Sequence, residues 1–166
     1  EWDRPNPQSV YGRSKLAGEL ELGDLSNASI LRISWVCGFH GANMVKTILR
    51  LADEHDTLHF VDDQHGCLTF AADAAAMVLR LVSERRPGLF HVTNQGAVSW
   101  FEFARAVLES AGHDPERVEP IGTADLDPPR PAPRPANSVL DNTALRLSDV
   151  PLLPHYRESL DRLVRE

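Results

Sequence analysis

The sequence predicts an α/β fold, because segments with helical periodicity alternate with short apolar segments that favour strands. Hydrophobic residues make up 42% and charged residues 25% of the 166 residues, which is the composition of a chain that packs a core. The formal net charge is −7 and Lys and Arg form no run. A role in binding nucleic acid or a membrane surface is therefore not expected.

The first half of the chain alternates helix and strand. Ser9 is a suitable N-cap for a helix that ends near Leu22. SILRISWVC, residues 29–37, is short and rich in β-branched and aromatic residues, as expected of a buried strand. Helical spacing then returns at Met44, Val45, Ile48, Leu49 and Ala52. TLHFV at 57–61 predicts another strand, and DDQHG after it predicts a turn.

The second half repeats this order. Residues 70–83 carry apolar side chains along one helical face, and 88–94 read as a strand. A further helix begins at Ser99, which forms a capping box with Glu102, and it ends at Gly112; a strand follows around 118–121. Alternation of this kind favours parallel pairing of the strands.

A proline-rich stretch separates these elements from the C-terminus. Residues 125–137 hold five prolines, which exclude helix and central strand and leave a stiff loop with Arg130 and Arg134. Such a loop suits a diphosphate clamp, because guanidinium groups grip phosphate oxygens in pairs. Its PxxP pattern also permits a polyproline ligand for a partner domain. A short strand, SVLD, a small helix and a terminal helix opened by Pro154 are expected after it.

Tyr11 and Lys15 are candidates for acid–base chemistry. Residues four apart lie on one face of a helix. An ammonium beside a phenol favours the phenolate and lowers the pKa of the phenol, which brings it closer to the range where it exchanges protons at neutral pH. The alternative is a solvated helix face on which Lys15 pairs with Glu19.

Cysteine and histidine supply no metal pattern. Cys37 and Cys67 have neither metal spacing nor the count of a disulfide framework, so we expect free thiols in a reducing cytoplasm. The histidines and aspartates over 55–65 match no zinc spacing, which favours surface histidines. No apolar run reaches the ~18 residues of a membrane span.

Six motifs resemble, in order and spacing, the second half of a known family over almost the whole chain. They are YGRSKLAGE, ILRISWVCG, GANMVKTILRLA, VDDQHGCLTF, GLFHVTNQGAVSWFEFARAVLE and RPAPRPANSVLD. The first resembles the active-site helix of extended short-chain dehydrogenases/reductases. More narrowly, the set resembles the dTDP-4-dehydrorhamnose reductase family.

This resemblance implies roles for individual residues. Tyr11 would protonate the C4 oxygen of a dTDP-sugar as hydride arrives from NADPH or NADH, and Lys15 would hold the nicotinamide ribose. Trp35 would lie against the sugar, although a buried core indole is the alternative. Asn43 and Lys46, at the start of a helix, would face the nucleotide-diphosphate side, as would Arg130 and Arg134; Lys46 as ordinary surface charge is the alternative. Some relatives form a homodimer with an interface Mg²⁺ site, which nothing in this sequence locates.

The resemblance also implies an organisation. Residues 1–38 would be a remnant of a Rossmann-like domain and 39–166 mainly the substrate-binding region, with 70–94 returning to the Rossmann sheet. No G-x-x-G-x-x-G occurs in the chain, so we expect a C-terminal portion that has little activity by itself and self-associates through its exposed strand and helix.

Two positions depart from the family. Cys37 stands where tyrosine is usual and Leu68 where proline is usual, and both are expected near the substrate pocket, which puts the sugar in doubt. Another nucleotide-sugar 4-ketoreductase or epimerase is thus one alternative. A non-catalytic regulator, like the methionine adenosyltransferase β-subunit, is another, but the intact Tyr11 and Lys15 favour an enzyme.

Overall fold

The computed structural model describes residues 1–23 and 25–165. Its helices are α1 (Val10–Leu22), α2 (Met44–Glu54), α3 (Ala71–Ser83), α4 (Trp100–Ser110), α5 (Thr143–Leu147) and α6 (Tyr156–Arg165), with 3₁₀ turns η1 (Pro115–Arg117) and η2 (Thr123–Asp125). Its strands are β1 (Ser29–Arg32), β2 (Val36–Cys37), β3 (Leu58–Val61), β4 (His65–Cys67), β5 (Thr69–Phe70), β6 (Gly88–His91), β7 (Ala97–Ser99), β8 (Val118–Ile121) and β9 (Asn137–Ser138). This is the predicted α/β class.

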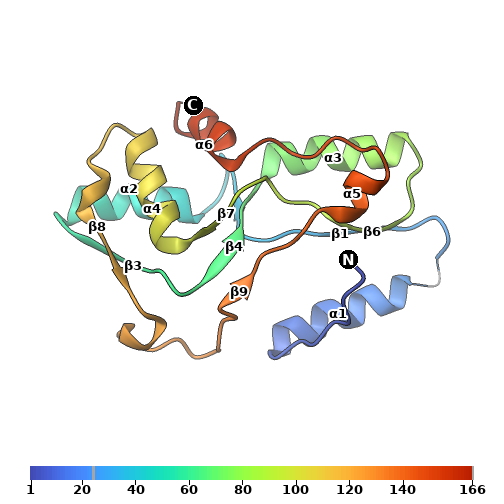
Figure 1. Ribbon diagram of the computed structural model, residues 1–166, viewed down its shortest axis with the longest axis horizontal. Coiled ribbons are helices and arrows are strands. Elements are labelled where there is room, and N and C mark those ends of the chain that lie inside the picture. Colours follow the sequence, from blue (N-terminus) through green and yellow to red (C-terminus); the bar gives the residue numbers. More distant parts are fainter. Residues whose placement is uncertain (24, 166) are drawn as a thin grey trace.

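The molecule is elongated and has two lobes (Figure 1). In one lobe the parallel strands β1 and β6 run between α3 and α1. In the other, the parallel strands β3 and β8 lie with α2 and α4. Between the lobes, β4 pairs antiparallel with β7 and parallel with β9. Because β6 pairs with β1, the end of the segment 70–94 lies beside the first strand of the chain.

Each lobe has its own apolar core. Met77 and Leu81 of α3 pack with Phe90 of β6 and Leu145 of α5. The larger core is formed chiefly by α2, α4 and the strands next to them; its fully buried side chains include Ile48, Leu68, Phe103, Val107, Leu108 and Leu160. The capping box that begins α4 is confirmed, since Ser99 Oγ accepts from the Glu102 amide at 3.0 Å and a Glu102 carboxylate oxygen accepts from the Ser99 amide at 2.7 Å.

Helix α1 differs from the other long helices because it buries no side chain. Glu19 joins it to the sheet by a two-pronged ion pair with Arg32 of β1, at 2.6 and 2.8 Å. Arg32 holds the pKa of the Glu19 carboxyl below its ordinary value through these hydrogen bonds, and burial opposes the effect only in part. The Glu19–Arg32 ion pair thus helps to attach α1 to the sheet, whereas apolar packing attaches the other long helices.

The predicted single strand over 29–37 is wrong. The structure ends β1 at Arg32 and begins β2 at Val36, and β2 pairs with β5 instead of β6. Trp35 in the gap has φ +44, a left-handed conformation that no regular strand contains. The chain turns there from one lobe toward the other.

Two smaller expectations also differ. Residues 62–66 are not wholly a turn, because His65 and Gly66 belong to β4 and pair with β7 and β9. The terminal helix begins at Tyr156, two residues after Pro154.

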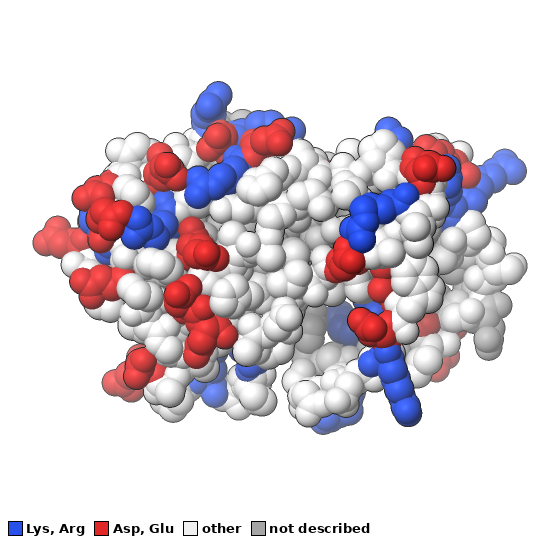
Figure 2. All heavy atoms as spheres, viewed as in Figure 1, with Lys and Arg blue, Asp and Glu red and all other residues white. Residues whose placement is uncertain are grey.

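In the described part of the chain, no helix has both the length and the apolar character needed to cross a membrane. Basic and acidic side chains are interspersed on the face seen in Figure 2.

Candidate active site

Tyr11 and Lys15 lie on one face of α1, as their spacing predicts. Ser9 caps the helix by accepting from the Gly12 amide at 3.0 Å, and the Lys15 ammonium stands 5.2 Å from the centre of the Tyr11 ring. The alternative pairing of Lys15 with Glu19 is not what the structure shows, since both Glu19 oxygens accept from Arg32. Lys15 is left exposed and close to the phenol.

Tyr11 reaches the rim of a cleft of about 620 Å³. Trp35, Arg130 and Arg134 line the same cleft, although Trp35 and the two arginines lie far apart in the sequence. The remaining lining residues are Ile33, Ser34, Val36, Met44, Gln64, Trp100, Pro135 and Ser138. A hydroxyl, two guanidinium groups and two indoles thus surround a space large enough for a sugar nucleotide.

Arg130 and Arg134 bring positive charge to this cleft. The loop from 126 to 136 forms neither helix nor strand, in agreement with its prolines. Within residues 1–23 and 25–165, the arginine ion pairs use Arg32, Arg50, Arg80, Arg86, Arg105, Arg146, Arg157 and Arg162. Arg130 and Arg134 are not among them, so their donors remain available to an anion in a chain of net charge −7.

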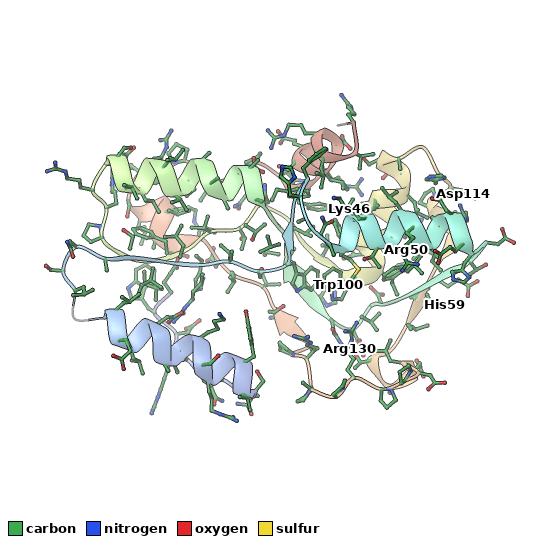
Figure 3. The ribbon with its side chains drawn as sticks, turned by 180° about the vertical axis from the view of Figure 1, so that it is seen from behind. Lys46, Arg50, His59, Trp100, Asp114 and Arg130 are labelled. Carbon is green, nitrogen blue, oxygen red and sulfur yellow. The ribbon has the colours of Figure 1, made fainter. Side chains whose placement is uncertain are left out.

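Asn43 and Lys46 do not line the cleft. Asn43 is the N-cap of α2. Its side-chain oxygen Oδ1 accepts from the Lys46 backbone amide at 3.3 Å, and its side-chain nitrogen Nδ2 donates to the Gly38 backbone carbonyl at 2.7 Å. The Lys46 ammonium donates to the Phe39 carbonyl oxygen. Figure 3 shows Lys46 at the N-terminal end of α2, apart from Arg130. Met44, between the two, does line the cleft.

Lys15 lines a second, smaller hollow of about 280 Å³, formed with residues 5–7, Gly12, Leu16, Glu19 and Arg32. Tyr11 and Lys15 therefore line two different hollows. An ammonium and a phenol there fit the nicotinamide-ribose end of a dinucleotide, which offers hydroxyls as hydrogen-bond partners. The described residues supply no glycine-rich turn between strand and helix for its pyrophosphate.

Cys37 and Leu68 lie behind the cleft wall and not on its surface, although Cys37 directly follows Val36, which lines the cleft. Both belong to the larger core and neither lines the cleft. Burial raises the pKa of the Cys37 thiol to about 11. At both positions that depart from the family pattern, the side chain is part of the core, so its size and shape are constrained by packing.

Sequence reasoning missed Trp100, Gln64 and Ser138 as cleft residues. Trp100 stacks on Trp35 with ring centres 3.7 Å apart, and buried Gln64 donates to the Thr123 hydroxyl at 2.8 Å. No local signal marks these residues, because each reaches the cleft through pairing of distant strands. Among the described residues no cluster of three or more His, Cys, Asp or Glu side chains could hold a metal ion.

Comparison with known proteins identifies the family of this chain. The RmlD substrate binding domain family matches residues 1–166. A dTDP-4-dehydrorhamnose reductase of Mycobacterium tuberculosis is 42% identical over 161 residues, which cover 95% of this chain and 52% of the relative. One of Sinorhizobium fredii is also 42% identical, over 99% of this chain and 58% of the relative. The chain thus spans about half the length of the curated relatives it matches.

Solved structures give the same result. A dTDP-4-dehydrorhamnose reductase ortholog of Clostridium acetobutylicum superposes with a TM-score of 0.93 at 39% identity, covering 99% of this chain and 58% of that one. The enzyme of Bacillus anthracis in complex with NADP superposes with a TM-score of 0.89 at 36% identity, covering 98% and 57%. With the α/β fold and the matched motifs, these likenesses show that the chain belongs to the RmlD substrate binding domain family, within the extended short-chain dehydrogenase/reductase fold.

Proposed function

We propose that this chain provides the proton donor and the sugar-nucleotide site of a dTDP-4-dehydrorhamnose reductase. The reaction is the reduction of dTDP-4-dehydro-6-deoxy-L-mannose to dTDP-L-rhamnose with NADPH or NADH. The observation that carries the proposal is the position of Tyr11, which stands beside Lys15 and opens into a cleft that also holds Arg130 and Arg134. The names of the relatives support the substrate class.

The residues divide the work between binding and proton transfer. A bound nicotinamide dinucleotide would supply the hydride that reaches C4 of the sugar. The Tyr11 hydroxyl donates its proton to the C4 oxygen, and the Lys15 ammonium stabilises the negative charge left on the phenol. Arg130 and Arg134 hold the diphosphate, and the Trp35 indole packs against the sugar ring. Asn43 and Lys46 would contribute indirectly: their side chains donate to the backbone carbonyls of residues 38–39 and so fix the loop before α2.

The test is NADPH oxidation in the presence of the 4-keto sugar nucleotide. We would compare the chain alone with a fusion to the part of the Mycobacterium tuberculosis relative that the chain does not cover. We expect activity in the fusion and little in the chain alone, because this chain contains no glycine-rich dinucleotide motif.

Tyr11→Phe in the fusion should lower kcat about 10²- to 10⁴-fold, the usual contribution of a general acid. Glu21→Gln, an exposed change on the same helix, is the matched control and should leave kcat unchanged. Full activity of the Tyr11→Phe fusion would refute the assignment of the proton donor. An inactive fusion that still binds dTDP would favour a regulatory protein over an enzyme.

A further inference from the structure

Two of the three tryptophans form a stacked pair in the wall of the cleft. The ring centres of Trp35 and Trp100 are 3.7 Å apart and their planes differ by 15°. Both residues line the cleft with Tyr11 and the two arginines, whereas Trp2 is 71% exposed and lies elsewhere. The pair joins the turn between β1 and β2 to the first residue of α4.

Trp35 sits in a conformation that needs support. Its φ of +44 lies in the left-handed region, which bulky residues rarely adopt and which persists only when the surroundings enforce it. The neighbouring backbone is fixed by Thr69, which donates its amide to the Trp35 carbonyl and accepts from the Ser34 amide with its hydroxyl. These contacts fix the main chain and leave the orientation of the indole to its packing partners.

Gly66 is one of these partners. A Cβ built on Gly66 would lie 2.6 Å from Trp35 Cε2 and 2.7 Å from Cζ2, closer than side-chain carbons approach one another. Gly66 belongs to β4 and has no left-handed φ. Glycine is therefore required there because no room exists for a side chain, and not because of the backbone conformation. Any other residue there would displace the indole, and also the Ser138 hydroxyl, whose oxygen would lie 2.9 Å from that Cβ.

Trp100 is the other partner, and it is itself held firmly. It is the first residue of α4, directly after the buried N-cap Ser99 of the capping box. The Ser99 hydroxyl also donates to an Asp62 carboxylate oxygen at 2.6 Å, which ties the start of α4 to the end of β3. The Trp100 ring also packs against Phe103, with ring centres 6.2 Å apart. The ring against which Trp35 stacks is therefore fixed by α4 and by its contacts with β3.

We propose that Trp100 is a positioning residue that, with Gly66, holds the Trp35 indole in the orientation in which it meets the sugar ring of the bound nucleotide. This inference rests on the proposed function and deepens it. The diphosphate is recognised separately by Arg130 and Arg134. Loss of Trp100 should therefore weaken binding of the sugar moiety and leave binding of the nucleotide part unchanged.

The experiment is calorimetric titration of the chain with dTDP and with dTDP-rhamnose. Trp100→Leu should weaken dTDP-rhamnose binding about 3- to 10-fold, the range expected when one aromatic contact is lost. Its affinity for dTDP should change less than ~2-fold, because the arginines are untouched. Trp100→Phe keeps a ring in the stack and should restore most of the affinity for dTDP-rhamnose.

Two further variants separate positioning from general stability. Gly66→Ala should weaken dTDP-rhamnose binding selectively, because it displaces Trp35 from a different element without changing Trp100. Phe101→Leu, the neighbouring position in α4, lines a different hollow beside Arg105 and should alter neither affinity. This control also removes an aromatic ring from the first turn of α4, so a loss of affinity in both Trp100→Leu and Phe101→Leu would indicate a structural effect of α4.

A spectroscopic signature reports the stack directly. In Trp2→Phe protein the cleft pair is the sole source of indole signal, and its stacked rings should give a coupled band in far-ultraviolet circular dichroism. Trp100→Phe should abolish this band, and dTDP-rhamnose should perturb it more than dTDP does. Absence of the band from the Trp2→Phe parent would refute the stacked arrangement.

The outcomes distinguish the two proposals. If the parent binds both ligands and Trp100→Leu and Gly66→Ala retain full affinity for dTDP-rhamnose, the positioning role is refuted and the proposed function stands. If the parent binds neither ligand, the proposed function fails and the positioning role fails with it. Selective loss of dTDP-rhamnose affinity in both variants supports both proposals.

Discussion

At the scale of single residues, the cleft combines groups that would be ordinary on their own. Tyr11 is 69% exposed, and Arg130 and Arg134 stand on a loop without regular structure. Their significance comes from convergence on one space, with an indole wall behind them. Spacing along α1 predicted the contact between Tyr11 and Lys15, because both lie on one helix. No spacing could predict that Trp100 would stack on Trp35.

The buried thiols give a prediction at this scale. Burial raises the pKa of Cys37 to about 11, so at neutral pH almost no thiolate is present to react. We expect the Cys67→Ser variant, in which Cys37 is the remaining thiol, to resist alkylation by iodoacetamide in the native state at pH 8. Denaturant should restore rapid labelling, measured by mass spectrometry. Rapid labelling of the native variant would show that Cys37 is accessible and would contradict the core position.

At the scale of elements, α1 is the helix that depends most on a single polar contact. None of its side chains is fully buried, and Leu16 and Glu19 are only partly covered, so we infer that the Glu19–Arg32 ion pair is the main contact that holds it against β1. The other long helices present apolar stripes to a core and are held by several contacts each. Because α1 carries Tyr11 and Lys15, the same ion pair also sets the position of the proposed proton donor.

Glu19→Gln should therefore loosen α1 selectively. We expect faster amide hydrogen exchange over residues 10–22 and a loss of stability on the order of 1 kcal/mol, because the pair is charge-assisted but partly solvated. Glu21→Gln, on the exposed side of the helix, is the control and should leave exchange unchanged. Equal exchange in both variants would show that other contacts hold α1.

The same ion pair predicts how α1 responds to acid. The pKa of Glu19 is lowered in the folded state, chiefly by the hydrogen bonds from Arg32, so folding is favoured by its ionised form. Its contribution is complete above its ordinary pKa of 4.5 and is lost as the pH falls below that value toward the folded-state pKa. Exchange in α1 should accelerate below pH 4.5, relative to the intrinsic rates, in the parent but not in Glu19→Gln. An acid response that persists in Glu19→Gln would assign it to another group.

At the scale of the whole molecule, helix α1 and the residues that follow it expose several apolar side chains. Val10, Leu20, Leu22 and Leu25 are exposed on and after α1. Within the described residues, β1 pairs with β6 on one edge and has no strand on the other. An open strand edge beside exposed apolar side chains favours association with another protein surface.

We therefore expect the chain by itself to self-associate reversibly, which sedimentation velocity over a range of concentrations would detect. Leu20→Lys should shift the equilibrium toward monomer, because it places a charge in the apolar surface. Leu147→Lys, at an equally exposed leucine on α5, should have no such effect. A parent chain that remains monomeric throughout the concentration range would contradict this expectation.

The sequence by itself determined the elements whose causes are local. Ser9 and Ser99 with Glu102 mark helix starts, the prolines exclude regular structure over 126–136, and apolar periodicity places α2 and α3. Tyr11 and Lys15 belong to this class, since a helix fixes the relation of residues four apart. Only the tertiary structure decided the break of the strand at Trp35, the stacking of Trp100, and the placing of Cys37 and Leu68 in the core. These features depend on pairing between strands far apart in the chain, whose register is set by side-chain packing across the two lobes and not by neighbouring residues.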